Sequence, residues 1–156
     1  SEIEQSLSWR QLRDAMLTLS DGIIYEENVK RYKTFCTQSF LMSIIQDCDR
    51  YFDIRKGVAE KNRISAAQRN LIKNIETCQQ RLRENIKGLE KTDSKATNGL
   101  LTRYLKDLNA QEDALVNANK EIERCAAFVY SQEELSKSIT SKIKSAAVKA
   151  LEQINE

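Results

Sequence analysis

Histidine and proline are both absent from this chain of 156 residues, and glycine occurs only four times. Without histidine, the sequence excludes Ser-His-Asp and Cys-His nucleophilic catalysis, imidazole metal ligands and imidazole-based pH switching near neutrality. It also lacks a glycine-rich phosphate loop, and the Glu-x-x-His motif of di-iron bundles cannot form. Few enzymes work without histidine, so we expect a protein that is not an enzyme, without catalytic residues, cofactor or metal.

The scarcity of turn-forming residues indicates helices. A sheet-rich or loop-rich fold needs more glycine and proline than this chain has, whereas strong helix formers fill most of the sequence. Hydrophobic residues make up 40% and charged residues 31%, a balance typical of long amphipathic helices. The sequence predicts an all-α fold, an elongated antiparallel helical bundle of three to five helices with coiled-coil character. We expect a single domain over residues 1–156.

The chain also lacks a signal peptide, and no uninterrupted apolar run approaches the roughly 20 residues of a membrane-spanning helix. Its four cysteines form no Cys-x-x-Cys pair and fall at apolar-face positions, where a free thiol behaves as a small hydrophobe: Cys36, Cys48, Cys78 and Cys125. We therefore expect an intracellular, cytoplasmic protein. The even number of cysteines leaves disulfides in an oxidising compartment open, and the first residue, Ser1, leaves open that the chain is an excised domain.

The spacing of apolar residues divides the chain into helical segments. The first ends at Ser20-Asp21-Gly22, with Trp9 beside its apolar stripe of Ile3, Leu7, Leu12, Met16 and Leu19. Helical spacing continues from Ile23 to about Gly57, where either a break or one uninterrupted helix fits the sequence. The stretch 88–99 has two glycines and several polar turn formers, so it is the predicted reversal loop. Ser131 begins a capping-box match, which fits a helix restart or a continuous helix.

The most regular periodicity follows residue 70, with apolar residues at steps of four and three: Leu71, Ile75, Cys78, Leu82, Ile86 and Leu89. This alternation is typical of a coiled-coil seam, and it lasts for less than three heptads. The sequence therefore predicts that these six residues face a neighbouring helix.

The most apolar stretch is CTQSFLMSIIQDC, residues 36–48. If it is one helix, the Cα atoms of Cys36 and Cys48 are separated by about 18 Å, whereas a disulfide requires about 7 Å or less. We therefore expect both cysteines to line a core. The broad apolar turn between them is either the best-buried part of the bundle or a docking site for a partner helix. Its candidate partner-docking residues are Phe40, Leu41, Ile44 and Ile45.

Charge is unevenly distributed although the net charge is only +2. Residues 1–29 carry two basic and six acidic side chains, and residues 30–95 carry fifteen and eight. Complementarity between neighbouring helices is the simpler interpretation, and a surface for an acidic partner is the alternative. Candidate contacts with an anionic surface come from the helix before the loop and from the lysine-rich C-terminal segment: Arg81, Arg83, Lys87, Lys142, Lys144 and Lys149. No aromatic residues interleave with them, so nucleic-acid binding is not expected.

These features predict a protein–protein interaction module, a scaffold, adaptor or assembly subunit that binds another protein or a second copy of itself through helix packing. A membrane-surface or membrane-remodelling domain, using the basic helices, is the first alternative. An extracellular or periplasmic sensing bundle, with oxidised cysteines, is the second.

Overall fold

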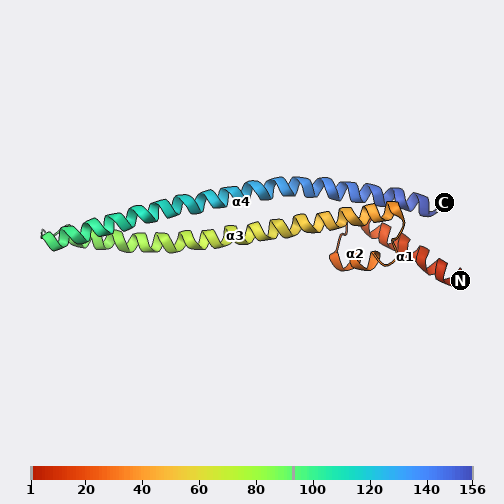
Figure 1. Ribbon diagram of the computed structural model, residues 1–156, viewed down its shortest axis with the longest axis horizontal. Coiled ribbons are helices and arrows are strands. Elements are labelled where there is room, and N and C mark those ends of the chain that lie inside the picture. The colour runs from red at the N-terminus through yellow and green to blue at the C-terminus, as the bar shows by residue number, and fades with distance from the viewer. Residues whose placement is uncertain (1, 93, 156) are drawn as a thin grey trace. The chain divides into compact units, whose positions relative to one another are not determined.

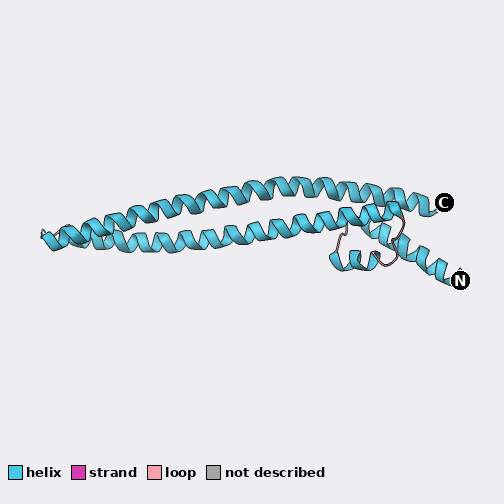
Figure 2. Ribbon diagram, in the orientation of Figure 1, coloured by secondary structure: helices cyan, strands magenta, loops and turns pink. Residues whose placement is uncertain are grey.

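The computed structural model describes residues 2–92 and 94–155, and the side chains of residues 8–92 and 94–154. These residues form four helices and no strand: α1 (Glu2–Ser20), α2 (Glu26–Tyr32), α3 (Ser39–Leu89) and α4 (Lys95–Asn155) (Figures 1 and 2). The helices α3 and α4 pack antiparallel against each other. The predicted all-α, antiparallel helical fold is confirmed. The side chains of Ile3 and Leu7, expected on the first apolar stripe, lie outside the described residues.

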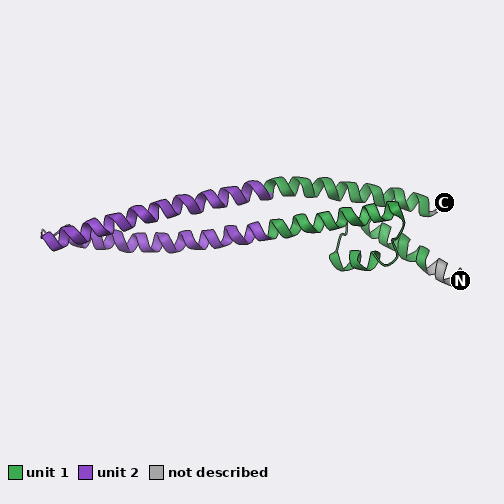
Figure 3. Ribbon diagram, in the orientation of Figure 1, with its two compact units in different colours: residues 1–59, 130–156 green, residues 60–129 purple. Residues whose placement is uncertain are grey.

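The chain divides into two compact units (Figure 3). We call residues 1–59 and 130–156 the four-helix unit, because all four helices contribute to it. Residues 60–129 form the hairpin unit, which contains only the last part of α3, the first part of α4 and their connection. The helices continue through both units: α3 is not interrupted at Gly57, and α4 is not restarted at Ser131.

The end of α1 matches the sequence prediction. Gly22 has a φ of +78°, a left-handed conformation that glycine adopts without steric cost. Its N–H donates to the Leu19 carbonyl at 2.9 Å, and the N–H of Ile23 donates to the Thr18 carbonyl at 3.1 Å. This pair of hydrogen bonds is a Schellman motif, which satisfies carbonyl groups that the last helical turn leaves free.

The chain turns between α2 and α3, where apolar spacing alone indicated continued helix. The Tyr32 carbonyl accepts the N–H groups of Phe35 at 3.1 Å and Cys36 at 2.8 Å, which closes α2. The helix α3 begins only at Ser39, so the premise that residues 36–48 form one helix is wrong for its first three residues. Cys36 and Cys48 are nevertheless buried in one core, as predicted, and both are free thiols.

The core of the four-helix unit contains residues from each of its helices. Met16 and Leu19 of α1, Val29 of α2, Leu41 of α3 and Ile143 of α4 are among its fully buried side chains. Small residues of α4, Ala147 and Ala150, are also buried there and allow close approach of the neighbouring helices. The short helix α2 is therefore held by packing, since seven residues are too few for a stable isolated helix.

The connection between α3 and α4 lies within the stretch 88–99. The helix α3 ends at Leu89 and α4 begins at Lys95, so both glycines of that stretch are helical. Ser94 caps α4: its side-chain oxygen accepts the N–H of Thr97 at 3.2 Å, and its carbonyl accepts the N–H of Asn98 at 2.9 Å. The capping serine, rather than a glycine, marks the start of the returning helix.

Candidate functional site

The two helices of the hairpin unit meet along a heptad seam. The less exposed residues recur at alternating steps of three and four on both helices. On α3 the residues with this spacing are Lys61, Ser65, Gln68, Ile72, Ile75, Gln79, Leu82, Ile86 and Leu89, and Ile64 beside them is also only partly exposed. On α4 they are Thr97, Leu101, Tyr104, Leu108, Gln111, Leu115, Ala118, Ile122, Cys125 and Val129, and Ala114 and Glu121 beside them are also only partly exposed.

The seam on α3 differs from its sequence prediction at two positions. Leu71 and Cys78 were expected in the seam, but both are exposed, and the adjacent residues Ile72 and Gln79 take their places. Leu71 and Cys78 lie one position to the side, seven residues apart. The apolar residues that sequence reasoning assigned to the seam thus form part of a flank next to it.

Burial within the hairpin unit is modest. Among its described residues only Ser65, Gln79, Ala118 and Cys125 are buried, and none of these is a large apolar side chain. Gln79 donates a hydrogen bond to Glu112 at 2.8 Å, while the buried side-chain oxygen of Gln111 has no hydrogen-bond partner. The seam is therefore partly polar, and a large fraction of the apolar surface of the unit remains in contact with water.

A groove between the two helices identifies one side of the hairpin. It has a volume of about 440 Å³ and an open, solvent-facing shape, and its lining comes from both helices: Cys78, Arg81, Leu82, Asp107, Ala110 and Gln111. Because a heptad repeat returns to the same side every seven residues, the positions of Cys78 and Asp107 define a flank along each helix. On α3 this flank contains Ile64, Leu71, Cys78 and Asn85, and on α4 it contains Leu100, Asp107, Ala114, Glu121 and Phe128.

Six of these nine flank residues are apolar, and we call the six the apolar flank: Ile64, Leu71, Cys78, Leu100, Ala114 and Phe128. Leu71, Leu100 and Phe128 are 44, 37 and 38% exposed, whereas Ile64 and Ala114 are only partly exposed. The flank on the other side of the seam is different, since only Leu105 and Ala126 among its nine positions are apolar. These positions are Asn62, Arg69, Glu76 and Arg83 on α3, and Asn98, Leu105, Glu112, Asn119 and Ala126 on α4. That side carries the polar contacts of Glu112 with Gln79 and with Arg83, whose ion pair measures 3.8 Å.

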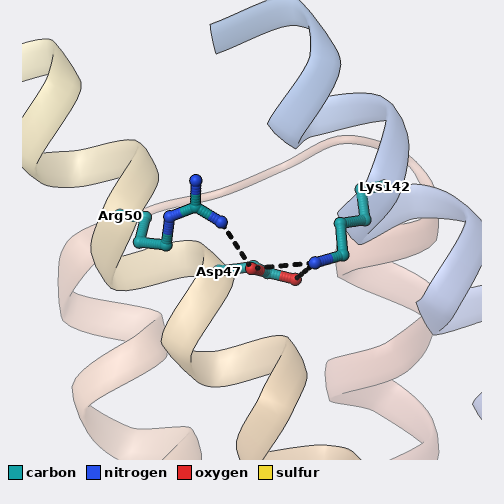
Figure 4. Close-up of polar contacts among 3 residues, drawn as sticks. All are labelled: Asp47, Arg50 and Lys142. Atoms are coloured by element: carbon teal, nitrogen blue, oxygen red, sulfur yellow. Dashed lines mark hydrogen bonds and ion pairs between the residues drawn. The ribbon is translucent and has the colours of Figure 1, made fainter. Parts of the chain in front are cut away.

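In the four-helix unit, the most buried charged side chain is Asp47 of α3 (Figure 4). Its Oδ2 lies 3.2 Å from Lys142 Nζ of α4, and its Oδ1 lies 3.4 Å from Arg50 Nη1. A buried carboxylate needs such compensation, because an unpaired charge removed from water is strongly destabilising. The contact therefore joins α3 to α4 within this unit, and no sequence signal distinguished Asp47 from the exposed Asp49 and Asp53.

A small pocket of about 290 Å³ opens at the turn before α3. Cys36, Met42 and Ile45 line its apolar part, and Lys33 and Asp49, which form a 3.0 Å ion pair, also line it. Burial raises the pKa of the Cys36 thiol to about 11. Burial, together with the Asp49 and Asp47 carboxylates, raises the pKa of Cys48 to about 12. Thiols with such pKa values are almost entirely protonated near neutrality, so they are poor nucleophiles and metal ligands.

The four predicted docking residues are not equally accessible. Leu41, Ile44 and Ile45 are buried in the core of the four-helix unit, and Phe40 alone is exposed. This turn was expected to be either buried core or a docking site for a partner helix. For Leu41, Ile44 and Ile45 the structure favours buried core.

The six predicted basic residues are all exposed, but several have contacts within the chain. In the hairpin unit, Arg83 pairs with Glu112 and Arg81 lines the groove. In the four-helix unit, Lys142 pairs with Asp47, and a methyl group added at Gly22 would lie 3.4 Å from Lys144 Cδ. Lys87 and Lys149 complete the set, three residues in each unit.

Among the described residues, no cluster of three His, Cys, Asp or Glu side chains is arranged to hold a metal ion. Within the same part of the chain, no helix is both long and apolar enough to cross a membrane. Comparisons of the chain with protein-family models, curated proteins and solved structures give no match.

Proposed function

We propose that the chain is a non-enzymatic helical module that acts by protein–protein contact, and that it binds its partner through the apolar flank of the hairpin unit. The observation that carries this proposal is that the hairpin unit buries little apolar surface while apolar residues gather on one of its sides. Its described residues include no large buried apolar side chain, yet six apolar residues gather on one flank. Such a face is typical of a surface that packs against further helices.

The expected gain from covering this flank can be estimated from its three largest side chains. Complete burial of a Leu or Phe contributes about 1.5–3 kcal/mol. Because Leu71, Leu100 and Phe128 retain 44, 37 and 38% exposure, covering the remainder contributes on the order of 2–4 kcal/mol in total. Association also costs translational and rotational freedom, so these residues favour a reversible rather than a permanent contact.

The test compares two charge substitutions at similarly exposed positions. Leu71→Glu places a carboxylate on the apolar flank, and Val116→Glu places one at a 51% exposed position outside both flanks. Tagged full-length variants are expressed in the cells that produce the protein, and cross-linked partners are identified by mass spectrometry. Binding of each identified partner is then measured with purified proteins, and circular dichroism checks that both variants are folded.

We expect a partner that binds the unmodified chain and the Val116→Glu variant and is lost with Leu71→Glu. If Leu71→Glu retains every interaction of the unmodified chain, the flank is not a binding surface and the proposal is wrong. Sedimentation with vesicles of anionic phospholipid at low salt tests the membrane-surface alternative. Salt-sensitive binding that is lost when Arg81 and Lys87 are replaced by glutamine would favour that alternative over protein contact.

A further inference from the structure

We infer that the apolar flank is covered by a second copy of this chain, so that two hairpin units form a parallel four-helix bundle around a two-fold axis along the helices. The inference rests on the proposed function, because it names the partner of the same flank. In this dimer, α3 of one copy meets α4 of the other, and residues of opposite charge on these helices face each other.

The size of the flank fits a small symmetric interface. From Ile64 to Asn85 the flank of α3 extends for about 32 Å at 1.5 Å per residue, and two helices side by side are about 20 Å wide. Covering this face removes on the order of 600 Å² from water on each copy, and on the order of 1,200 Å² in the dimer, which is the lower end of specific interfaces. A two-fold contact uses the same patch twice, so the six apolar residues of each copy and the polar Asn85, Asp107 and Glu121 beside them all enter the contact.

The charges of the two helices determine the orientation. Within the hairpin unit, α3 residues 60–89 carry seven basic and three acidic side chains, whereas α4 residues 95–129 carry five of each. Two hairpins stacked face to face have two symmetric arrangements. A two-fold axis along the helices places α3 of one copy over α4 of the other, and a perpendicular axis in the interface places α3 over α3. Only the first keeps the basic α3 stretches of the two copies apart and brings them over the acidic residues of α4.

One pair of residues makes this complementarity specific. Arg81 and Asp107 line the same groove, so they lie at the same height along the hairpin. Among the described residues, no ion pair joins either of them to another side chain. A two-fold axis along the helices preserves height, and Arg81 of each copy then faces Asp107 of the other. The dimer contains this contact twice.

The first experiment measures the molar mass of the chain by analytical ultracentrifugation over about 1–500 μM, a range in which weak and moderate self-association is detected. We expect a reversible monomer–dimer equilibrium. Leu71→Glu is expected to weaken dimerisation at least tenfold, and Val116→Glu to leave it unchanged. A chain that is monomeric throughout this range, or a Leu71→Glu variant that dimerises as well as the unmodified chain, overturns the inference.

The second experiment tests the orientation with a charge exchange between copies. Arg81→Glu and Asp107→Lys each create two like-charge contacts in the dimer, so each variant alone is expected to dimerise at least tenfold more weakly. When the two variants are mixed, both contacts become opposite in charge, and a heterodimer forms that native mass spectrometry identifies by its mass. In the arrangement with α3 over α3, Arg81 does not face Asp107, so each variant alone would dimerise like the unmodified chain and the mixture would hold heterodimers only in statistical proportion. Unweakened dimers of the single variants, or no preference for the heterodimer, overturn the parallel bundle.

These outcomes separate the inference from the proposed function. If the chain is monomeric and its Leu71→Glu variant no longer binds a different, identified protein, the flank is still a binding surface. Its partner is then that protein and not a second copy of the chain. A Leu71→Glu variant that changes neither self-association nor any other contact contradicts both the proposed function and the inferred dimer.

Discussion

Replacing Ile44 by alanine tests whether the apolar turn at the start of α3 is core or a docking surface. Ile44 is 3% exposed and belongs to the core of the four-helix unit. The substitution removes three carbons at about 0.8 kcal/mol each, or about 2–3 kcal/mol of transfer free energy. The cavity left behind raises the expected loss in the free energy of unfolding to about 3–4 kcal/mol. Phe40, one turn earlier, is 40% exposed, and Phe40→Ala is expected to lose about 1–2 kcal/mol.

Urea unfolding at pH 7 measures both losses, followed by far-UV circular dichroism and by the fluorescence of Trp9, the single tryptophan of the chain. With a denaturant dependence of about 1–3 kcal/mol per molar urea, Ile44→Ala should lower the midpoint by about 1–4 M. The shift for Phe40→Ala should be about half as large or less. Equal shifts, or a Phe40→Ala variant that is the less stable of the two, would refute the assignment of Ile44 to the core.

Four further outcomes are expected. Gln111→Leu should raise the thermal midpoint, because it removes a buried oxygen without a hydrogen-bond partner. Such an unsatisfied acceptor lowers the free energy of unfolding by about 1–3 kcal/mol, and an unchanged or lower midpoint contradicts this expectation. Gly22→Ala should lower the free energy of unfolding by about 1–2 kcal/mol, since alanine is strained at positive φ, and a neutral result in urea unfolding would count against the described turn. Iodoacetamide at pH 8, followed by mass spectrometry, should modify exposed Cys78 well before buried Cys48, and all four cysteines once the chain is unfolded; fewer than four would support the extracellular alternative. Because the pKa of Cys36 rises from 9.0 to about 11 and that of Cys48 from 9.0 to about 12, unfolding releases protons above pH 9. The stability that these thiols contribute is therefore present below pH 9 and lost as pH rises toward 12, and Cys48→Ala should show a shallower alkaline loss than the unmodified chain.

The all-α class could be predicted from the sequence, because that prediction depends on composition, which tertiary packing does not change. A chain without proline and with few glycines has little other than helix available. The end of α1 was also predictable, because Gly22 is required for its left-handed conformation and the preceding Ser-Asp pair is a turn signal. The turn between α2 and α3 was not, because Phe35 and Cys36 maintain an apolar spacing while the Tyr32 carbonyl closes the helix.

The apolar flank was missed for a related reason. Both sets of positions, with Leu71 and Cys78 or with Ile72 and Gln79, satisfy steps of three and four and share the later residues of the seam. Sequence reasoning selects the more apolar set, but the structure buries Gln79, whose amide finds Glu112 on the other helix. A hydrogen bond to a residue 33 positions away has no signature in local spacing. The same holds for Asp47, whose cation Lys142 is 95 positions distant.

The hydrogen bond between Gln79 and Glu112 also sets the alignment of the two helices along their length. A heptad repeat looks nearly the same to its neighbour after a slide of seven residues, about 10 Å. Such a slide would place Gln79 opposite Leu105 or Asn119, and neither supplies a carboxylate. In the four-helix unit the same slide would separate Asp47 from Lys142 and leave a buried charge with less compensation. Polar contacts thus fix the axial register of α3 against α4, which aliphatic residues repeating every heptad cannot do. Each unit contains one such contact.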